Sequence, residues 1–141
     1  MQEQIGPLET PPAYEEPDVQ GISGYVTIDV GRTKDIRITF FSPGDEELGQ
    51  GYGQIYAVAT IEEVQELIRR LEEAASDRNK IELGASYAAI YMTGDIVVIE
   101  ASSNTNPENI EALEFSKEQA VELAQALRSA IQLAEEISLK T

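Results

Sequence analysis

Three consecutive acids, Asp45, Glu46 and Glu47, lie in a glycine-rich stretch that also holds Tyr52. Carboxylates are the oxygen ligands that calcium and magnesium prefer, but calcium loops place their ligands at alternate positions. A phosphate-binding glycine loop has to lead into a helix, whereas this stretch leads into a strand-like segment. We therefore expect no metal site and no nucleotide site here. The four residues are a candidate partner-binding loop.

A second candidate contact is the pair Tyr87 and Tyr91, which lie four residues apart in a strand-like segment and so share one face. If they are exposed, two tyrosines can anchor a partner, because each presents a large, rigid surface at a small entropic cost. The alternative is that they cover the core beneath the helices, which agrees with the intermediate burial usual for tyrosine.

The composition offers little for catalysis. The chain has no histidine and no cysteine, and therefore lacks the commonest general base, thiolate nucleophiles and the usual transition-metal ligands. Its serines have no histidine to activate them, and none lies in a Gly-x-Ser-x-Gly context. Asp29, Asp95 and Glu100 lie in or beside predicted strands, so a carboxylate-dependent enzyme is an alternative if one of them is buried. We predict a non-enzyme without catalytic residues or a cofactor.

The elements that must position these residues follow from the periodicity of the apolar residues. Val26, Ile28 and Val30 alternate with more polar residues, and Ile36 and Phe40 continue one apolar face after a turn. A period of two residues indicates strands, so this region is predicted to be a hairpin with one apolar side.

A third strand is predicted over residues 54–59, and a helix follows it. Thr60 and Glu63 have the spacing of a capping box, in which each side chain accepts a hydrogen bond from the other residue's backbone amide. Apolar residues then recur at spacings of three and four, which is typical of an amphipathic helix, and the helix is expected to end near residues 77–79.

The second half of the chain repeats this plan. Residues 81–99 are predicted to form another hairpin, and residues 110–115 a short strand. Ser116 and Gln119 form a second capping box at the start of a longer helix.

These elements predict an α+β protein with one domain over residues 21–141. It consists of two successive hairpin-strand-helix units, at about 21–78 and 79–141. One sheet face and one helix stripe are marginal on their own, so we expect both units to share a mostly antiparallel sheet with the two helices packed on it.

Residues 1–20 combine prolines with acids and contain no basic residue. They cannot bury enough apolar surface to offset the entropy of ordering, so we expect a flexible acidic tail. Within it, Pro11-Pro12-Ala13-Tyr14 resembles the Pro-Pro-x-Tyr ligand of WW domains, although so short a pattern also arises by chance. Pro11, Pro12 and Tyr14 are a candidate tail motif.

Antiparallel strands followed by a capped helix, seen twice, resemble the Whirly family in element order. This resemblance implies binding of single-stranded nucleic acid on the sheet through basic and aromatic strand residues. Only Arg32, Lys34 and Arg37 lie near the first hairpin, and no basic residue lies in the second. Because basic residues are scarce, nucleic-acid binding is an alternative function and not the main hypothesis.

The net charge directs the main hypothesis. The chain has 26 acidic and 10 basic residues, a formal charge of −16, which repels phosphate backbones and attracts basic surfaces. We expect a protein-binding module, for example an inhibitor or adaptor of a basic, nucleic-acid-binding protein, and we do not expect direct nucleic-acid binding.

The remaining expectations concern location and assembly. The chain has neither a signal-peptide pattern nor a run of 18 apolar residues, so we expect a cytoplasmic protein without membrane contact. Leu133, Ile137 and Leu139 lie partly off the main apolar stripe of the second helix, and a homodimer through that helix is a further hypothesis.

Overall fold

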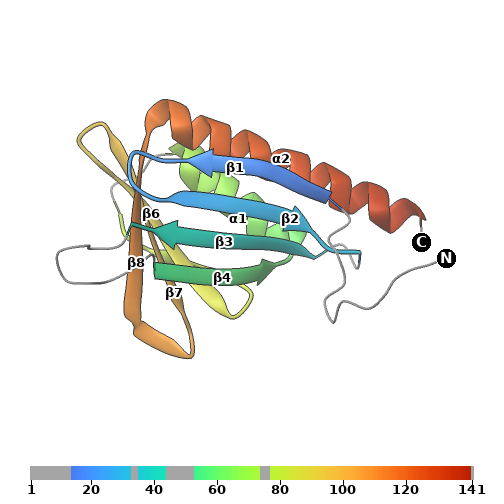
Figure 1. Cartoon of the computed structure of the whole chain (residues 1–141), viewed down its shortest axis with the longest axis horizontal. Coiled ribbons are helices and arrows are strands. Elements are labelled where there is room, and N and C mark those ends of the chain that lie inside the picture. Colours follow the sequence, from blue (N-terminus) through green and yellow to red (C-terminus); the bar gives the residue numbers. More distant parts are fainter. Residues whose placement is uncertain (1–13, 33–34, 44–52, 74–76, 141) are drawn as a thin grey trace.

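The computed structural model describes residues 14–32, 35–43, 53–73 and 77–140. This part of the chain contains eight strands and two helices (Figure 1). In chain order they are β1 Tyr14–Gln20, β2 Tyr25–Val30, β3 Ile36–Ser42, β4 Gly53–Ala59, α1 Ile61–Glu73, β5 Lys80–Leu83, β6 Ser86–Thr93, β7 Ile96–Ser103, β8 Asn106–Ser116 and α2 Lys117–Lys140.

The first sheet has one buried face because apolar and polar residues alternate along its strands. β2 and β3 pair antiparallel, with Val26 opposite Phe40 and Ile28 opposite Ile38, and all four side chains are buried. Successive side chains of a strand point to opposite faces. This register therefore sends the apolar residues of the hairpin inward and the intervening residues outward.

The second sheet buries one face in the same way. Ile90 of β6 lies opposite Ile99 of β7, which in turn lies opposite Leu113 of β8. These three side chains are fully buried, as is Phe115, two residues further along β8. β6, β7 and the edge strand β8 therefore contribute a continuous apolar layer to the core.

Both helices begin at the predicted capping boxes. The backbone amide of Thr60 donates to Glu63 Oε1 at 3.0 Å, and the amide of Glu63 donates to Thr60 Oγ1 at 3.1 Å. Ser116 and Gln119 make the same reciprocal pair at 2.9 and 3.1 Å. These bonds satisfy amides that have no partner within a helix, which explains why short local patterns located the helix starts.

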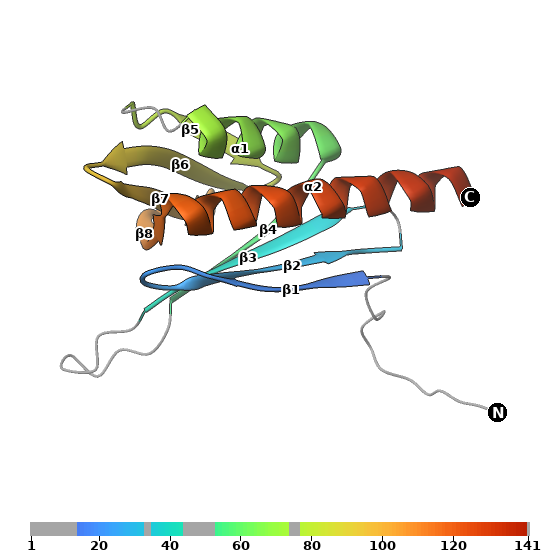
Figure 2. The same ribbon diagram turned by 90° about the horizontal axis from the view of Figure 1, so that it is seen from above.

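The helices pack into one core with both sheets. Leu67 and Leu71 of α1 and Leu123 and Leu127 of α2 belong to a single contiguous cluster of buried side chains. Both helices lie on the same side of the β1–β4 sheet (Figure 2), and no helix of the described part of the chain covers its other side. In the described residues, neither helix is long and apolar enough to cross a membrane.

The predicted α+β class with two strand-and-helix units is confirmed, but the strands form two four-stranded sheets, β1-β2-β3-β4 and β5-β6-β7-β8. They do not share one sheet because the turn between β5 and β6 contacts the edge of β4. Ser86 Oγ donates to the carbonyl of Tyr56 at 2.9 Å, and a Cβ added to Gly84 would lie 2.1 Å from the carbonyl oxygen of Val58. The turn occupies the place of a fifth strand.

The first sheet also extends into the predicted tail. Residues 14–20 form β1, an edge strand that pairs antiparallel with β2, while residues 1–13 lie outside the described part of the chain. The register shifts between Glu16 and Val19, around Pro17, which has no amide hydrogen to donate to a ladder. Val19 is buried. Backbone pairing with β2 and the burial of Val19 hold this strand in place. An argument from side-chain composition takes no account of backbone pairing, and it therefore predicted a flexible segment here.

Candidate partner-binding faces

Most of the residues singled out from the sequence as partner contacts lie outside the described part of the chain, and their roles stay predictions. They are Pro11, Pro12, Asp45, Glu46, Glu47 and Tyr52. Tyr14 is the first residue of β1 and pairs with Val30 of β2. The structure does describe Tyr87 and Tyr91, as well as a group of outward-facing aromatic residues that the sequence argument passed over.

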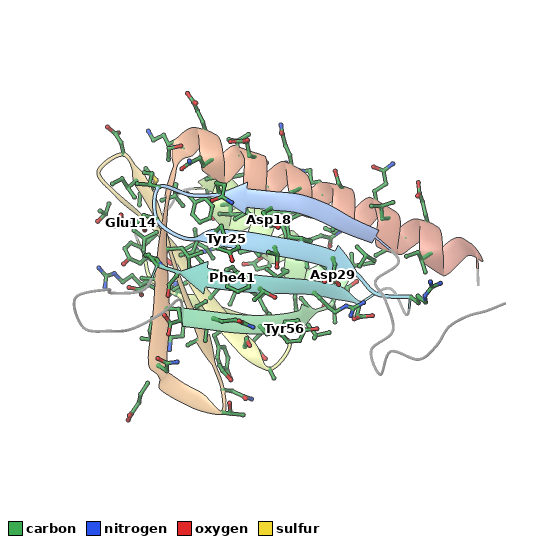
Figure 3. All side chains as sticks on the ribbon, in the orientation of Figure 1. Asp18, Tyr25, Asp29, Phe41, Tyr56 and Glu114 are labelled. Atoms are coloured by element: carbon green, nitrogen blue, oxygen red, sulfur yellow. The ribbon has the colours of Figure 1, made fainter. Side chains whose placement is uncertain are left out.

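The outer face of the β1–β4 sheet carries a pair of stacked aromatic rings. Tyr25 and Phe41 are cross-strand partners in β2 and β3, and their ring centroids lie 4.6 Å apart with an interplanar angle of 11°. Both side chains lie on the side of the sheet that faces the viewer in Figure 3. Stacking of this kind holds the two rings in place, so the face offers a rigid aromatic platform.

The neighbouring strand β4 continues this surface with two exposed apolar residues. Tyr56 is 50% exposed and Val58 is 42% exposed, while the alternating residues Ile55 and Ala57 are buried. Tyr56 lies opposite Thr39 of β3, next to the aromatic pair (Figure 3). We call the surface formed by Tyr25, Phe41, Tyr56 and Val58 the aromatic face. Period-two alternation with an aromatic residue at outward positions was the signal that could have identified it.

The charges on this sheet are predominantly negative. Arg37 is the only basic residue in β1–β4, and its Nε lies 2.8 Å from Asp29 Oδ1 and 3.4 Å from Asp35 Oδ2. Two carboxylates therefore neutralise the one guanidinium. Asp18 of β1 is exposed at the other end of the sheet. The aromatic face has acids at its margins and no unpaired cation among the described residues of its strands.

Tyr91 lies on the outer face of the second sheet and is nevertheless buried. Its neighbour Ile90 points into the core cluster, so Tyr91 points away from it, yet its exposure is only 7%. The hydroxyl donates to Glu100 Oε2 at 2.9 Å, and the guanidinium carbon of Arg78 lies 4.3 Å from the ring centroid. Burial, and then the hydrogen bond to Glu100, raise the pKa of the Tyr91 hydroxyl.

Neither sequence-based interpretation of the two tyrosines describes this arrangement. Tyr87 is half-buried on the same outer face as Tyr91, so the pair does not cover the core beneath the helices. Tyr91 is not an exposed anchor either, because Arg78 and the residues around it cover the ring. The contact with Arg78 comes from outside the strand, and strand periodicity could not have predicted it.

The acids proposed as catalytic candidates all have structural partners. Asp29 pairs with Arg37, and Glu100 accepts the hydrogen bond from Tyr91. Asp95 is almost completely exposed and lies 3.8 Å from Lys117 Nζ. Over the described residues, no group of three or more acidic side chains is placed to hold a metal ion. Nothing in these contacts singles out a reacting group, and the enzyme alternative stays untested.

A cleft of about 330 Å³ between the two helices is lined in part by Arg69 and Arg128. Arg69 pairs with Glu66 and Glu73 on its own helix, and Arg128 pairs with Glu72 across the cleft. The charges of both guanidinium groups are therefore matched by carboxylates, which makes the cleft an inter-helix contact and not an anion site.

The homodimer through α2 stays a prediction, and two of the residues that suggested it do not form exposed apolar surface. Leu133 and Ile137, which lie off the main stripe, are half-buried and pack against the core cluster, so they are not spare apolar surface. Val121 is the large apolar residue of α2 that is well exposed among those described, at 54%.

Comparison of the chain with protein-family models, with curated proteins and with solved structures finds no match.

Proposed function

We propose that the chain is a non-enzymatic protein-binding module that contacts its partner through the aromatic face. The observation that carries this proposal is the stacked pair Tyr25 and Phe41 beside exposed Tyr56, on the side of the sheet that neither described helix covers. Aromatic side chains at the centre of a contact supply most of its binding energy when a partner removes them from water. A rigid pair loses little entropy on binding.

The partner we propose is a protein with a basic surface around an apolar centre. The formal charge of −16 attracts such a surface at long range, and the acids at the margins of the aromatic face match a basic rim. Electrostatic attraction of this kind mainly raises the association rate, and salt weakens it. Inhibition of a nucleic-acid-binding protein, or an adaptor role, would follow from covering that basic surface.

Single-stranded nucleic acid is a second candidate ligand for the same face. The stacked rings of Tyr25 and Phe41 favour it, because bases stack on aromatic side chains of open sheets, and the Whirly-like element order agrees. The scarcity of cations opposes it: Arg37 is the only basic residue in β1–β4, and it is already paired with Asp29 and Asp35. Phosphate binding depends on such cations.

Affinity capture with Tyr25→Ala and Phe41→Ala variants tests the proposal. The unaltered chain is expected to retain a basic protein from a lysate of the source organism at low salt, and both variants are expected to bind it roughly tenfold more weakly or worse. Val121→Ala, a matched loss of exposed apolar surface on α2, should bind normally.

Binding of a fluorescent single-stranded oligonucleotide, measured in parallel, separates the two candidates. Tight oligonucleotide binding that the Tyr25→Ala variant loses would move the assignment to nucleic acid. Retention of the basic protein by every variant alike would place the contact elsewhere on the molecule and overturn the assignment of the face.

A further inference from the structure

We propose that the outer face of the β5–β8 sheet holds a receptor site for an arginine side chain of a partner protein, which the chain's own Arg78 occupies in this structure. The site consists of the Tyr91 ring with Glu100 beside it, and we call it the arginine site. It lies on the other sheet from the aromatic face and does not depend on the function proposed for that face.

The first argument is the position of the Arg78 guanidinium over the ring. The guanidinium carbon of Arg78 lies 4.3 Å from the centroid of the Tyr91 ring, within the range where the ring's negative face attracts a cation. The structure thus contains an arginine over the ring, in the position that we propose for the guanidinium of the ligand. The ligand would add a hydrogen bond to Glu100, which Arg78 does not make.

The second argument is that the site is rigid without its occupant. Tyr91 lies within β6, opposite Val98 of β7, and its hydroxyl is fixed by the hydrogen bond to Glu100. Strand pairing and this hydrogen bond do not involve Arg78, and they restrict the ring to one orientation. A receptor site that needs no ordering on binding keeps more of its binding energy.

The third argument is the charge around the ring. β6, β7 and β8 contain no basic residue and several acids, and the one basic residue of the sheet is Lys80 of β5, which lies opposite Ala89 on the same outer face. The carboxylates of Glu100 and Glu114 both act electrostatically on the Tyr91 hydroxyl, and Arg78 opposes them. Without the Arg78 guanidinium, the acids Glu82, Glu100 and Glu114 on this face would outnumber Lys80. The excess negative charge would attract a cation from solution.

The fourth argument is that Arg78 is held weakly. The ring contact is the only interaction of its side chain within the described part of the chain, and the residue is exposed in the connection between α1 and β5. Arg70, near the same connection, shows the contrast, since it is buried and bonded to Asp77 and to the carbonyl of Ile90. Rotation of one exposed side chain is enough to vacate the arginine site.

The site favours arginine over lysine as its ligand. A planar guanidinium can stack on an aromatic ring and donate to a neighbouring carboxylate at the same time, whereas an ammonium acts as a strongly hydrated point charge. An exposed arginine of a partner protein is therefore the chemistry that fits, and its binding would displace Arg78.

Removal of the internal competitor is the direct test. The probes are two short blocked peptides, one with a single arginine and one with a single lysine between glycines, titrated by NMR against the full chain. Arg78→Ala is expected to bind the arginine peptide about two- to fivefold more tightly than the unaltered chain, the factor that one exposed cation–π contact supports. The lysine peptide should bind more weakly.

Arg69→Ala is the control for the lost positive charge, because it removes an exposed arginine from α1. It should not raise the affinity for the arginine peptide. Arg78→Ala combined with Glu100→Gln, or with Tyr91→Leu where circular dichroism shows an intact fold, is expected to lose the gain. If Arg78→Ala binds the arginine peptide no better than Arg69→Ala does, or if the gain persists without the Glu100 carboxylate, the proposal is wrong.

Discussion

Two arginines near the connection between α1 and β5 show how single residues acquire different roles from their surroundings. Arg78 is exposed, and within the described residues its side chain contacts the ring of Tyr91 alone. Arg70 is 7% exposed, and its Nη2 lies 2.6 Å from Asp77 Oδ1 and 3.4 Å from the carbonyl oxygen of Ile90. A buried cation is tolerated only with such partners. Arg70 therefore holds the end of α1 against the second sheet, whereas we propose that the arginine of a partner replaces Arg78 on the ring.

Replacement of Asp77 by asparagine should destabilise the protein in a pH-dependent way. Hydrogen bonds from Arg70, and then from the backbone of Asn79, hold the pKa of the Asp77 carboxyl below its ordinary value. A lowered folded-state pKa adds stability above the unfolded-state pKa, and this stability is lost as pH falls through the folded-state pKa.

Urea unfolding of Asp77→Asn and of the unaltered chain, from neutral to acid pH, measures this effect. The difference in the free energy of unfolding should be largest near neutrality and shrink in acid. Asp95→Asn, at an almost completely exposed carboxylate, should change little at any pH. A difference for Asp77→Asn that stays constant into acid would contradict the ion-pair explanation.

At the scale of elements, the turn between β5 and β6 connects three parts of the fold. Its Gly84 amide donates to Glu63 Oε1 at 3.0 Å, and the same carboxylate oxygen accepts the amide of Thr60 at the start of α1. Ser86 Oγ bonds to the backbone of β4. The turn thus joins the first sheet, the first helix and the second sheet at one point, and it also ends the first sheet at β4.

Gly84→Ala is expected to destabilise the protein more than Gly94→Ala does. Both glycines have a positive φ, of 66° and 60°, which costs any other residue about 1–2 kcal/mol. Only at Gly84 would the new Cβ also meet a backbone atom, the carbonyl oxygen of Val58 at 2.1 Å, since Gly94 has nothing within 4 Å.

Thermal unfolding of the two variants separates backbone strain from the steric clash. Gly94→Ala supplies the strain alone, and the additional loss in Gly84→Ala measures the contact between the turn and β4. Equal losses in the two variants would mean that this contact does not hold the sheets together.

At the scale of the whole molecule, the net charge opposes folding as well as directing binding. A formal charge of −16 on 141 residues produces self-repulsion that the compact state increases. The described ion pairs, such as those of Arg37 and Arg128, relieve it only locally.

Moderate salt should therefore stabilise the free protein. Screening shortens the range of the repulsion to about 10 Å at 0.1 M ionic strength, so the Tm is expected to rise between low salt and about 0.1 M sodium chloride. The same salt should weaken capture of a basic partner. A Tm that falls with salt would show that the ion pairs contribute more than the repulsion costs.

Local sequence was sufficient for the helices and most strands. The capping boxes at Thr60 and Ser116 depend on contacts three residues apart, and alternation along β2 and β3 selects the buried face without reference to the rest of the chain. The α+β class and the repeated order of units therefore follow from the sequence, as does the strongly negative charge that makes a basic partner the natural hypothesis.

Contacts between distant residues decided the rest. β1 exists because its backbone pairs with β2, and the strands divide into two sheets because the turn at Gly84 meets β4. Tyr25 stacks on Phe41 through the register of two strands, and Arg78 reaches Tyr91 from another element. Composition and periodicity describe each segment separately, whereas pairing energies and steric exclusion act between segments, so only the tertiary structure shows which faces stay open.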